Sequence, residues 1–146
     1  MPTTTLYQRI KQGVVDQIKG LNLPEIGGVY NQYDCDTLNS VYPKITCISA
    51  GLTEELLGGD TELRQYLWPV GVMIEDDPGA KVHYLEPKYL TWRKMISDAF
   101  HQRRLGTIQE APGCIVLPRV IFDTRLSQYA AVRSSLLIKV EAWEQR

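Results

Sequence analysis

Residues 130–146 read A-A-V-R-S-S-L-L-I-K-V-E-A-W-E-Q-R and decide how the chain folds. Small or apolar side chains alternate in this stretch with mostly polar ones. One face of an extended strand would carry Val132, Ser134, Leu136, Ile138, Val140 and Ala142. The other face would carry Arg133, Ser135, Leu137, Lys139, Glu141 and Trp143. A period of two is typical of a half-buried strand. A long final strand therefore predicts that a β-sheet closes the fold.

Two other segments show helical periodicity. In residues 4–20 the apolar side chains recur every four positions, and Gly20 suits the end of a helix. Residues 87–104 predict a second helix, with Pro87 in its first turn and Gly106 after its end. The side chains expected to pack these helices on the sheet are Ile10, Val14, Leu90, Ile96, Ala99 and Phe100.

The middle of the chain predicts a long β-hairpin. Residues 45–50 and 66–75 have strand composition, and residues 51–64 between them contain the turn signal Gly58–Gly59–Asp60. Pro69 predicts an edge position or a bulge in the returning strand. The expected fold class is therefore α+β: an antiparallel or mixed β-sheet with a long β-hairpin and two α-helices packed on one face.

Composition limits the possible functions. The chain has 146 residues, 44% of them hydrophobic, and a formal net charge of −1, which predicts a single domain over residues 1–146. The small net charge provides no general attraction to nucleic acid or membranes. No apolar run approaches the roughly 20 residues of a membrane span, and the start lacks the pattern of a signal peptide. We expect a soluble protein made in the cytoplasm.

Catalytic and metal-binding motifs are missing from the sequence. No phosphate loop, dinucleotide fingerprint or nucleophile elbow occurs. Residues 34–36 do not continue into a calcium loop, and residues 75–77 fit a solvated turn better than a magnesium site. Cys114 has no identifiable base beside it, and the odd cysteine count predicts that Cys35, Cys47 and Cys114 are free thiols. The sequence predicts no catalytic residue, no cofactor, no metal and no enzyme activity.

The charges are distributed unevenly. Residues 54–77 carry seven acidic residues against Arg64 alone, a net charge of −6. Residues 88–104 carry five basic residues against Asp98, a net charge of +4. These segments could form complementary patches that join copies of the subunit head to tail, or two solvated faces paired locally within one subunit. The candidate interface residues are Glu54, Glu55, Tyr66, Trp68, Arg93, Lys94 and Trp143. The three aromatic residues among them could equally be core residues.

The order of these elements resembles the tail-terminator proteins of tailed bacteriophages, also called tail-completion or neck proteins. The resemblance spans most of the chain and is one of pattern. It is carried by L-Y-Q-R-I-K-Q-G-V-V-D-Q-I, Y-P-K-I-T-C-I-S, Y-L-W-P-V-G-V-M-I-E-D, Y-L-T-W-R-K-M-I-S-D-A-F and S-S-L-L-I-K-V-E-A-W-E. Residues 21–43 and the P-G-C-I-V-L-P segment have no clear counterpart in the family.

The resemblance implies a structural, non-enzymatic virion protein that is assembled in the host cytoplasm. Such proteins form a homo-oligomeric ring, usually a hexamer, that caps the finished tail tube and presents it to the head–tail connector. The implied partners are other copies of the chain, the tail-tube protein and the connector or neck proteins, with no membrane and no specific nucleic-acid sequence.

Other readings of the sequence remain open. Within the same class, the chain could be a head-closure or connector protein, or a tail-tube subunit. Outside that class, it could be a small nucleic-acid-binding module that uses the basic face of residues 88–104. A small nuclease or hydrolase using residues 75–77 is a further alternative.

Overall fold

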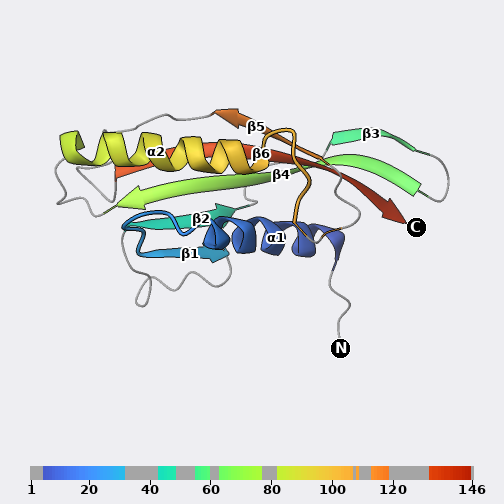
Figure 1. The fold of residues 1–146 in the computed structure, drawn as a ribbon. Helices are drawn as coiled ribbons and strands as arrows, with labels where there is room; N and C mark the ends of the chain where they lie inside the picture. Colours follow the sequence, from blue (N-terminus) through green and yellow to red (C-terminus); the bar gives the residue numbers. More distant parts are fainter. Residues whose placement is uncertain are drawn as a thin grey trace.

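A computed structural model describes residues 5–31, 43–48, 55–59, 63–76, 82–106, 108, 113–118 and 132–145. The helices and strands follow one another in an α+β order (Figure 1). They are α1 (Leu6–Gly20), β1 (Gly28–Asn31), β2 (Lys44–Ile48), β3 (Glu55–Gly59), β4 (Leu63–Asp76), α2 (Val82–Phe100), β5 (Gly113–Pro118) and β6 (Val132–Gln145).

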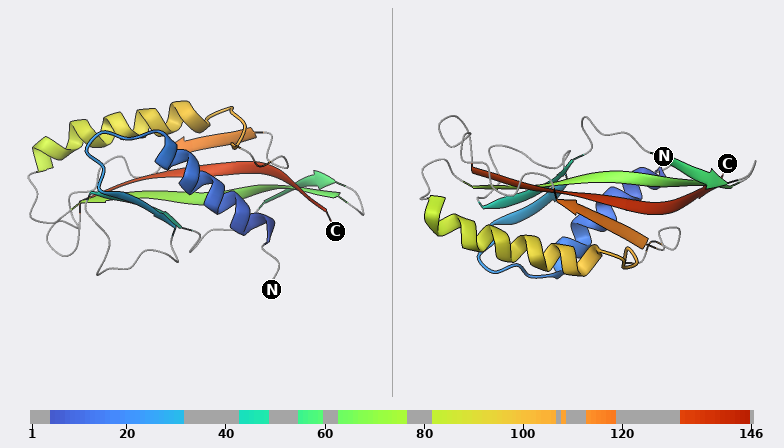
Figure 2. Two further views of the ribbon diagram at one scale, coloured as in Figure 1. Left: turned by 60° about the horizontal axis from the view of Figure 1, so that its bottom comes forward. Right: turned by 90° about the horizontal axis from the view of Figure 1, so that it is seen from above.

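The strands in the described part of the chain form one mixed sheet of six strands. Its order is β1-β2-β4-β6-β5, and β3 pairs with β4 on the same side as β2. The β1–β2 pair is parallel, whereas all other pairs are antiparallel. Both helices cover the same face of the sheet (Figure 2). The predicted fold class, with two helices on one face of a mixed sheet, is confirmed.

The pair formed by β4 and β6 is the longest in the sheet. Its register runs from Leu63↔Gln145 to Asp76↔Val132 without a shift. The alternation predicted for the final strand is confirmed on the even-numbered face from Ser134 to Ala142, whereas the side chains of Val132 and Arg133 lie outside the described part. The helix-covered face of β6 carries the buried residues Ser134, Leu136, Ile138, Val140 and Ala142. The opposite face departs from the simple pattern, because Leu137 is buried there while Trp143 is 37% exposed.

Helix α1 begins with a complete capping box. The Thr5 hydroxyl accepts from the Gln8 backbone N–H, and the Gln8 side chain accepts from the Thr5 N–H, so two otherwise unpaired donors are satisfied. The predicted apolar stripe is confirmed by the buried residues Leu6, Ile10, Val14 and Ile18. Fully burying each such side chain contributes about 1.5–3 kcal/mol.

Helix α2 differs from the prediction at its start and on one face. It begins at Val82, so Pro87 lies inside the helix rather than in its first turn. The expected contacts of Ile96 and Phe100 with the core are confirmed. The expectation for Leu90 is wrong, because this side chain is 44% exposed. The spacing of Tyr89, Trp92, Ile96 and Phe100, all fully buried, sets the inner face and turns Leu90 outward.

The predicted hairpin is only partly correct. β2 and β4 do pair in antiparallel fashion. Residues 51–64 are not a plain tip, however, because β3 (Glu55–Gly59) pairs with β4. Gly58 and Gly59 therefore belong to a strand instead of a turn, at a register shift between Leu56 and Gly58. Glycine is common at such irregular strand positions.

Pro69 lies in β4, beside the gap between the residues that pair with β2 and those that pair with β3. β2 pairs with residues 71–75 of β4, and β3 pairs with residues 64–67. Among the described strands, none therefore pairs with Pro69 on that side. The Pro69 carbonyl accepts a hydrogen bond from the Tyr7 hydroxyl of α1. A residue without an N–H fits here because no neighbouring strand needs its donor. The expectation of an edge-like position is confirmed.

Candidate assembly surface

Arg93 is a buried anchor between a helix and the sheet. Its side chain is 8% exposed, and its Nη1 atom donates to Ser134 Oγ (2.9 Å) and to the Ser135 carbonyl (2.6 Å). Burial lowers the pKa of the Arg93 guanidinium from its ordinary value. The prediction that Arg93 belongs to an exposed basic patch is wrong. Arg93 follows Tyr89 by four residues and precedes Ile96 by three, so helical periodicity already indicated the buried face.

The other cations of this segment make contacts within the subunit. Lys94 forms an ion pair with Asp98 at 3.0 Å, and Lys88 forms one with Glu25 at 3.0 Å. The Arg103 Nε donates to the Asp98 carbonyl at 2.9 Å. This contact provides a cation and a donor for the last turn of α2. For the basic segment, the structure favours local pairing over an unpaired patch that waits for a neighbouring subunit.

The acidic side of the predicted interface is placed only in part. Glu54 lies outside the described residues. Glu55 begins β3 opposite Leu67, and Tyr66 pairs with Leu56 on one side and Ala142 on the other. For Glu55 and Tyr66 the structure describes only the backbone, so their predicted interface role stays a prediction.

The two tryptophans predicted as anchors differ in environment. Trp68 is 8% exposed and stacks on Tyr7, with ring centroids 5.6 Å apart. The core alternative is therefore correct for Trp68 within the subunit. Trp143 is 37% exposed on the helix-free face of the sheet, where Ile115 is 41% exposed. Of the two predicted residues whose aromatic side chains are described, Trp143 is the one that the fold exposes to solvent.

One end of the sheet extends beyond the helices. We call this part the ribbon: β3, residues 63–67 of β4 and residues 141–145 of β6. Figure 1 shows it passing the ends of both helices. Among the described strands, β3 pairs with β4 alone, and β5 pairs with β6 only over residues 136–141. Among the described strands, none pairs with the outer edge of β3 or with residues 142–145 of β6 on the β5 side, so we call these the two open edges of the ribbon. β3 is difficult to predict from the sequence, because Gly58–Gly59 resembles a turn.

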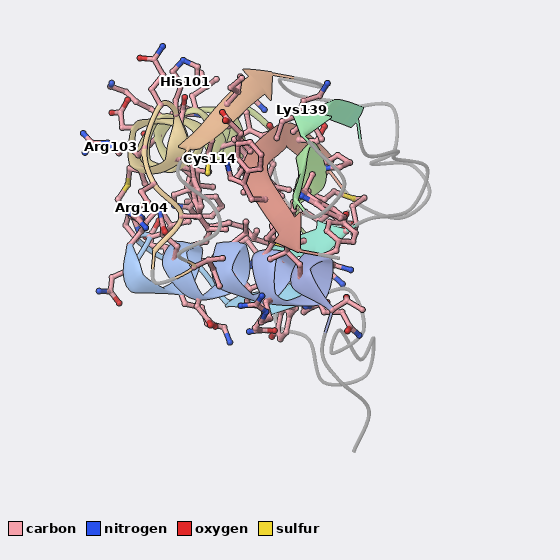
Figure 3. The ribbon with its side chains drawn as sticks, turned by 90° about the vertical axis from the view of Figure 1, so that its right-hand side faces the viewer. His101, Arg103, Arg104, Cys114 and Lys139 are labelled. Atoms are coloured by element: carbon pink, nitrogen blue, oxygen red, sulfur yellow. The ribbon has the colours of Figure 1, made fainter. Side chains whose placement is uncertain are left out.

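The edge of β5 is covered in a different way. The Val116 N–H donates to His101 Nδ1 (3.1 Å), and the Gln102 N–H donates to the Cys114 carbonyl (2.8 Å). Figure 3 shows His101, Arg103 and Arg104 at the end of α2, beside Cys114 of β5. The chain after α2 therefore takes up polar groups that a strand edge would otherwise expose. Sequence reasoning missed this contact, and the H-Q-R-R stretch carries no signal for it.

The described cysteines are poor nucleophiles. Cys47 and Cys114 are free, as predicted, and both are buried, whereas Cys35 lies outside the described residues. Burial raises the pKa of each of these two thiols to about 12; the nearby Lys11 ammonium opposes this shift at Cys47 without reversing it. Because the thiolate is the reactive form, neither group is prepared for nucleophilic attack.

The side chains that line two surface depressions do not suggest a catalytic site. One, of about 500 Å³, lies between the end of α1 and β1 and is lined by Lys19, Asn22, Leu23, Ile26, Gly28, Val29 and Tyr30. A smaller one, of about 250 Å³, is lined by Gly13, Asp16, Gln17 and Gly106. In the part of the chain that the structure describes, no three His, Cys, Asp or Glu residues are grouped to hold a metal ion. Neither described helix is both long and apolar enough to cross a membrane.

Comparison with models of known protein families finds no match for the chain. A search of curated proteins finds no match in sequence either.

Proposed function

We propose that this chain is a structural virion protein that forms a ring, caps the tail tube of a tailed bacteriophage and joins it to the head or neck. The proposal combines the resemblance to tail terminators with the fold. The element order of two helices and a closing antiparallel pair agrees with the pattern that carries the resemblance. Other copies of the chain, the tail-tube protein and a connector protein are the proposed partners.

The ribbon is the observation that carries this proposal. It continues the sheet beyond the helical layer, and the β4–β6 pair that forms its centre is continuous with the core of the subunit. A ring subunit must present a surface to each neighbour, and a strand extension that is continuous with the core can provide one. Trp143 adds an exposed aromatic side chain to the ribbon, and aromatic residues are enriched at interface hot spots.

The contacts of the basic segment give less support to a nucleic-acid-binding module. Sequence-independent binding to nucleic acid depends on exposed Lys and Arg side chains that can neutralise phosphates. Here Arg93 is buried against β6, and Lys88 and Lys94 form ion pairs with carboxylates of the same chain. A head-closure, connector or tail-tube role remains the alternative within the virion class.

A loss-of-function experiment in the virus that carries the chain tests the proposal. An early stop codon should yield filled heads and tails that stay separate, as seen by negative-stain electron microscopy of the lysate. The same chain supplied from a plasmid should restore joined particles, and a synonymous codon change at the same position is the matched control. Joined, infectious particles in the absence of the chain would contradict the proposal.

A further inference from the structure

The two outer strands of the ribbon, β3 and the end of β6, lie opposite the same residues of β4. Glu55 of β3 is opposite Leu67 of β4, which is opposite Glu141 of β6. At the other end, Gly59 and Glu144 both lie opposite Arg64. β3 and residues 141–144 of β6 thus occupy the two outer sides of β4 over the same length of the ribbon.

These two outer strands also run in the same direction, because each is antiparallel to β4. A rotation about an axis roughly along the strands would bring β6 of one copy beside β3 of the next. Neither strand would need to slide, and the new pair would be parallel. Repeating this rotation uses one edge of each kind on every copy, which is a heterologous contact that can close into a ring.

The backbone of β6 presents the required groups at this edge. Val116 directs its N–H away from β6, toward His101. By alternation, its partner Ile138 therefore directs its N–H and C=O toward β4, and the odd-numbered residues direct theirs toward the β5 side. The Tyr7 contact at Pro69, opposite Lys139, agrees with this assignment. Beyond the end of β5, Trp143 and Gln145 direct their N–H and C=O groups to the open edge.

We propose that copies of this chain associate by pairing residues 142–145 of β6 with β3 of the neighbouring copy, as parallel strands of a continuous sheet. This inference rests on the proposed ring-forming function and specifies its contact. The partner at the open edge of β6 is a second copy of this chain, because β3 of that copy offers a strand edge over the same stretch of the ribbon. His101 and Gln102 cover the β5 edge, whereas no described strand pairs with the outer edge of β3 or with residues 142–145 of β6 on the β5 side. Exposed edges of this kind are templates for pairing with another chain.

Proline at position 143 tests the pairing. Trp143→Pro removes an N–H that points to the open edge and leaves the β4–β6 ladder intact, because that ladder does not use it. Trp143→Val is the matched control, because it removes the same indole and retains the N–H in a strand-forming residue. Gln145→Pro blocks the edge at the next outward residue, close to the end of the strand. Light scattering after size-exclusion chromatography gives the mass of each full-length variant, and circular dichroism verifies its fold.

The parent chain and Trp143→Val should form the same oligomer, while both proline variants should be folded monomers of 16.6 kDa at the same concentration. If Trp143→Pro does not fold, Gln145→Pro decides the question. A folded proline variant that keeps the parent mass would overturn edge pairing and leave the proposed ring intact. Equal dissociation of Trp143→Val would assign the contact to the indole and would also overturn it. A parent that is monomeric at every concentration would overturn the proposed function, and this inference with it.

Discussion

Replacing Phe100 by alanine should remove a large part of the stability of the fold. Phe100 is the last residue of α2 and is fully buried, together with Trp92, Ile96 and Leu105. Truncating a buried phenylalanine leaves a cavity that its neighbours fill incompletely, at a cost of about 3–5 kcal/mol. Since about 1.4 kcal/mol corresponds to a factor of ten, the unfolding equilibrium constant should rise at least about a hundredfold.

Urea denaturation at a fixed protein concentration, followed by circular dichroism at 222 nm, measures this loss. Leu90→Ala is the control in the same helix, because Leu90 is 44% exposed and should cost less than about 1 kcal/mol. A cost under about 1 kcal/mol for Phe100→Ala would place Phe100 outside the core and refute the packing of α2. An equal cost for Leu90→Ala would mean that α2 buries a different face.

Four further predictions concern single side chains. Arg93→Ala should lower the free energy of unfolding by about 2–3 kcal/mol, because two acceptors on β6 lose a charged donor. In urea denaturation, Arg93→Lys should recover only part of this loss. An Arg93→Ala variant as stable as the parent would contradict the role of Arg93 as an anchor. The Cys47 and Cys114 thiols should resist an aromatic disulfide reagent at pH 8 until the protein is denatured, and rapid reaction of the native protein would contradict their burial. Burial raises both pKa values from 9.0 to about 12, so the stability they contribute is complete below pH 9 and should decline toward pH 12, seen as a lower urea midpoint. His101→Ala should speed hydrogen exchange at the Val116 amide by about fivefold, because its acceptor is lost, and an unchanged rate would refute the edge cover.

The elements that the sequence predicted correctly are those with a strict period. The alternation in residues 134–142 is clear because the even-numbered side chains of β6 in this range are buried on the face that the helices cover. The spacing of Leu6, Ile10, Val14 and Ile18 is clear for the same reason, since α1 has one buried face and one solvated face. The period of apolar residues reflects which side chains are buried, so an element with one buried and one solvated face is easy to assign from sequence.

The errors occurred where local signals and tertiary packing disagree. Gly58–Gly59 resembles a turn, yet pairing with β4 holds both residues in β3. Pro87 resembles the start of a helix, yet α2 begins five residues earlier, at Val82. The charge of Arg93 predicts a surface position, yet the Ser134 hydroxyl and Ser135 carbonyl provide polar partners inside the fold. No local pattern in β6 reports that a serine will accept from an arginine on α2.

The position of β3 and of the end of β6 opposite the same residues of β4 could not be predicted from the sequence either. It depends on the register of β3 and β6 against β4, and on where β5 stops along β6. Register is set by the hydrophobic pattern together with the geometry of the connections, and a strand as short as β3 carries little pattern of its own. The residue type of Trp143, in contrast, is enough to mark it as an interface candidate.

The mass of the native assembly tests the ring most directly. Native mass spectrometry of the full chain, with negative-stain images of the same sample, should give one closed species whose mass is a fixed multiple of 16.6 kDa. Six copies would give about 100 kDa, and the images should show rings with the subunits side by side. A spectrum that contains only the 16.6 kDa monomer across the accessible concentration range, with no ring in the images, would contradict the account.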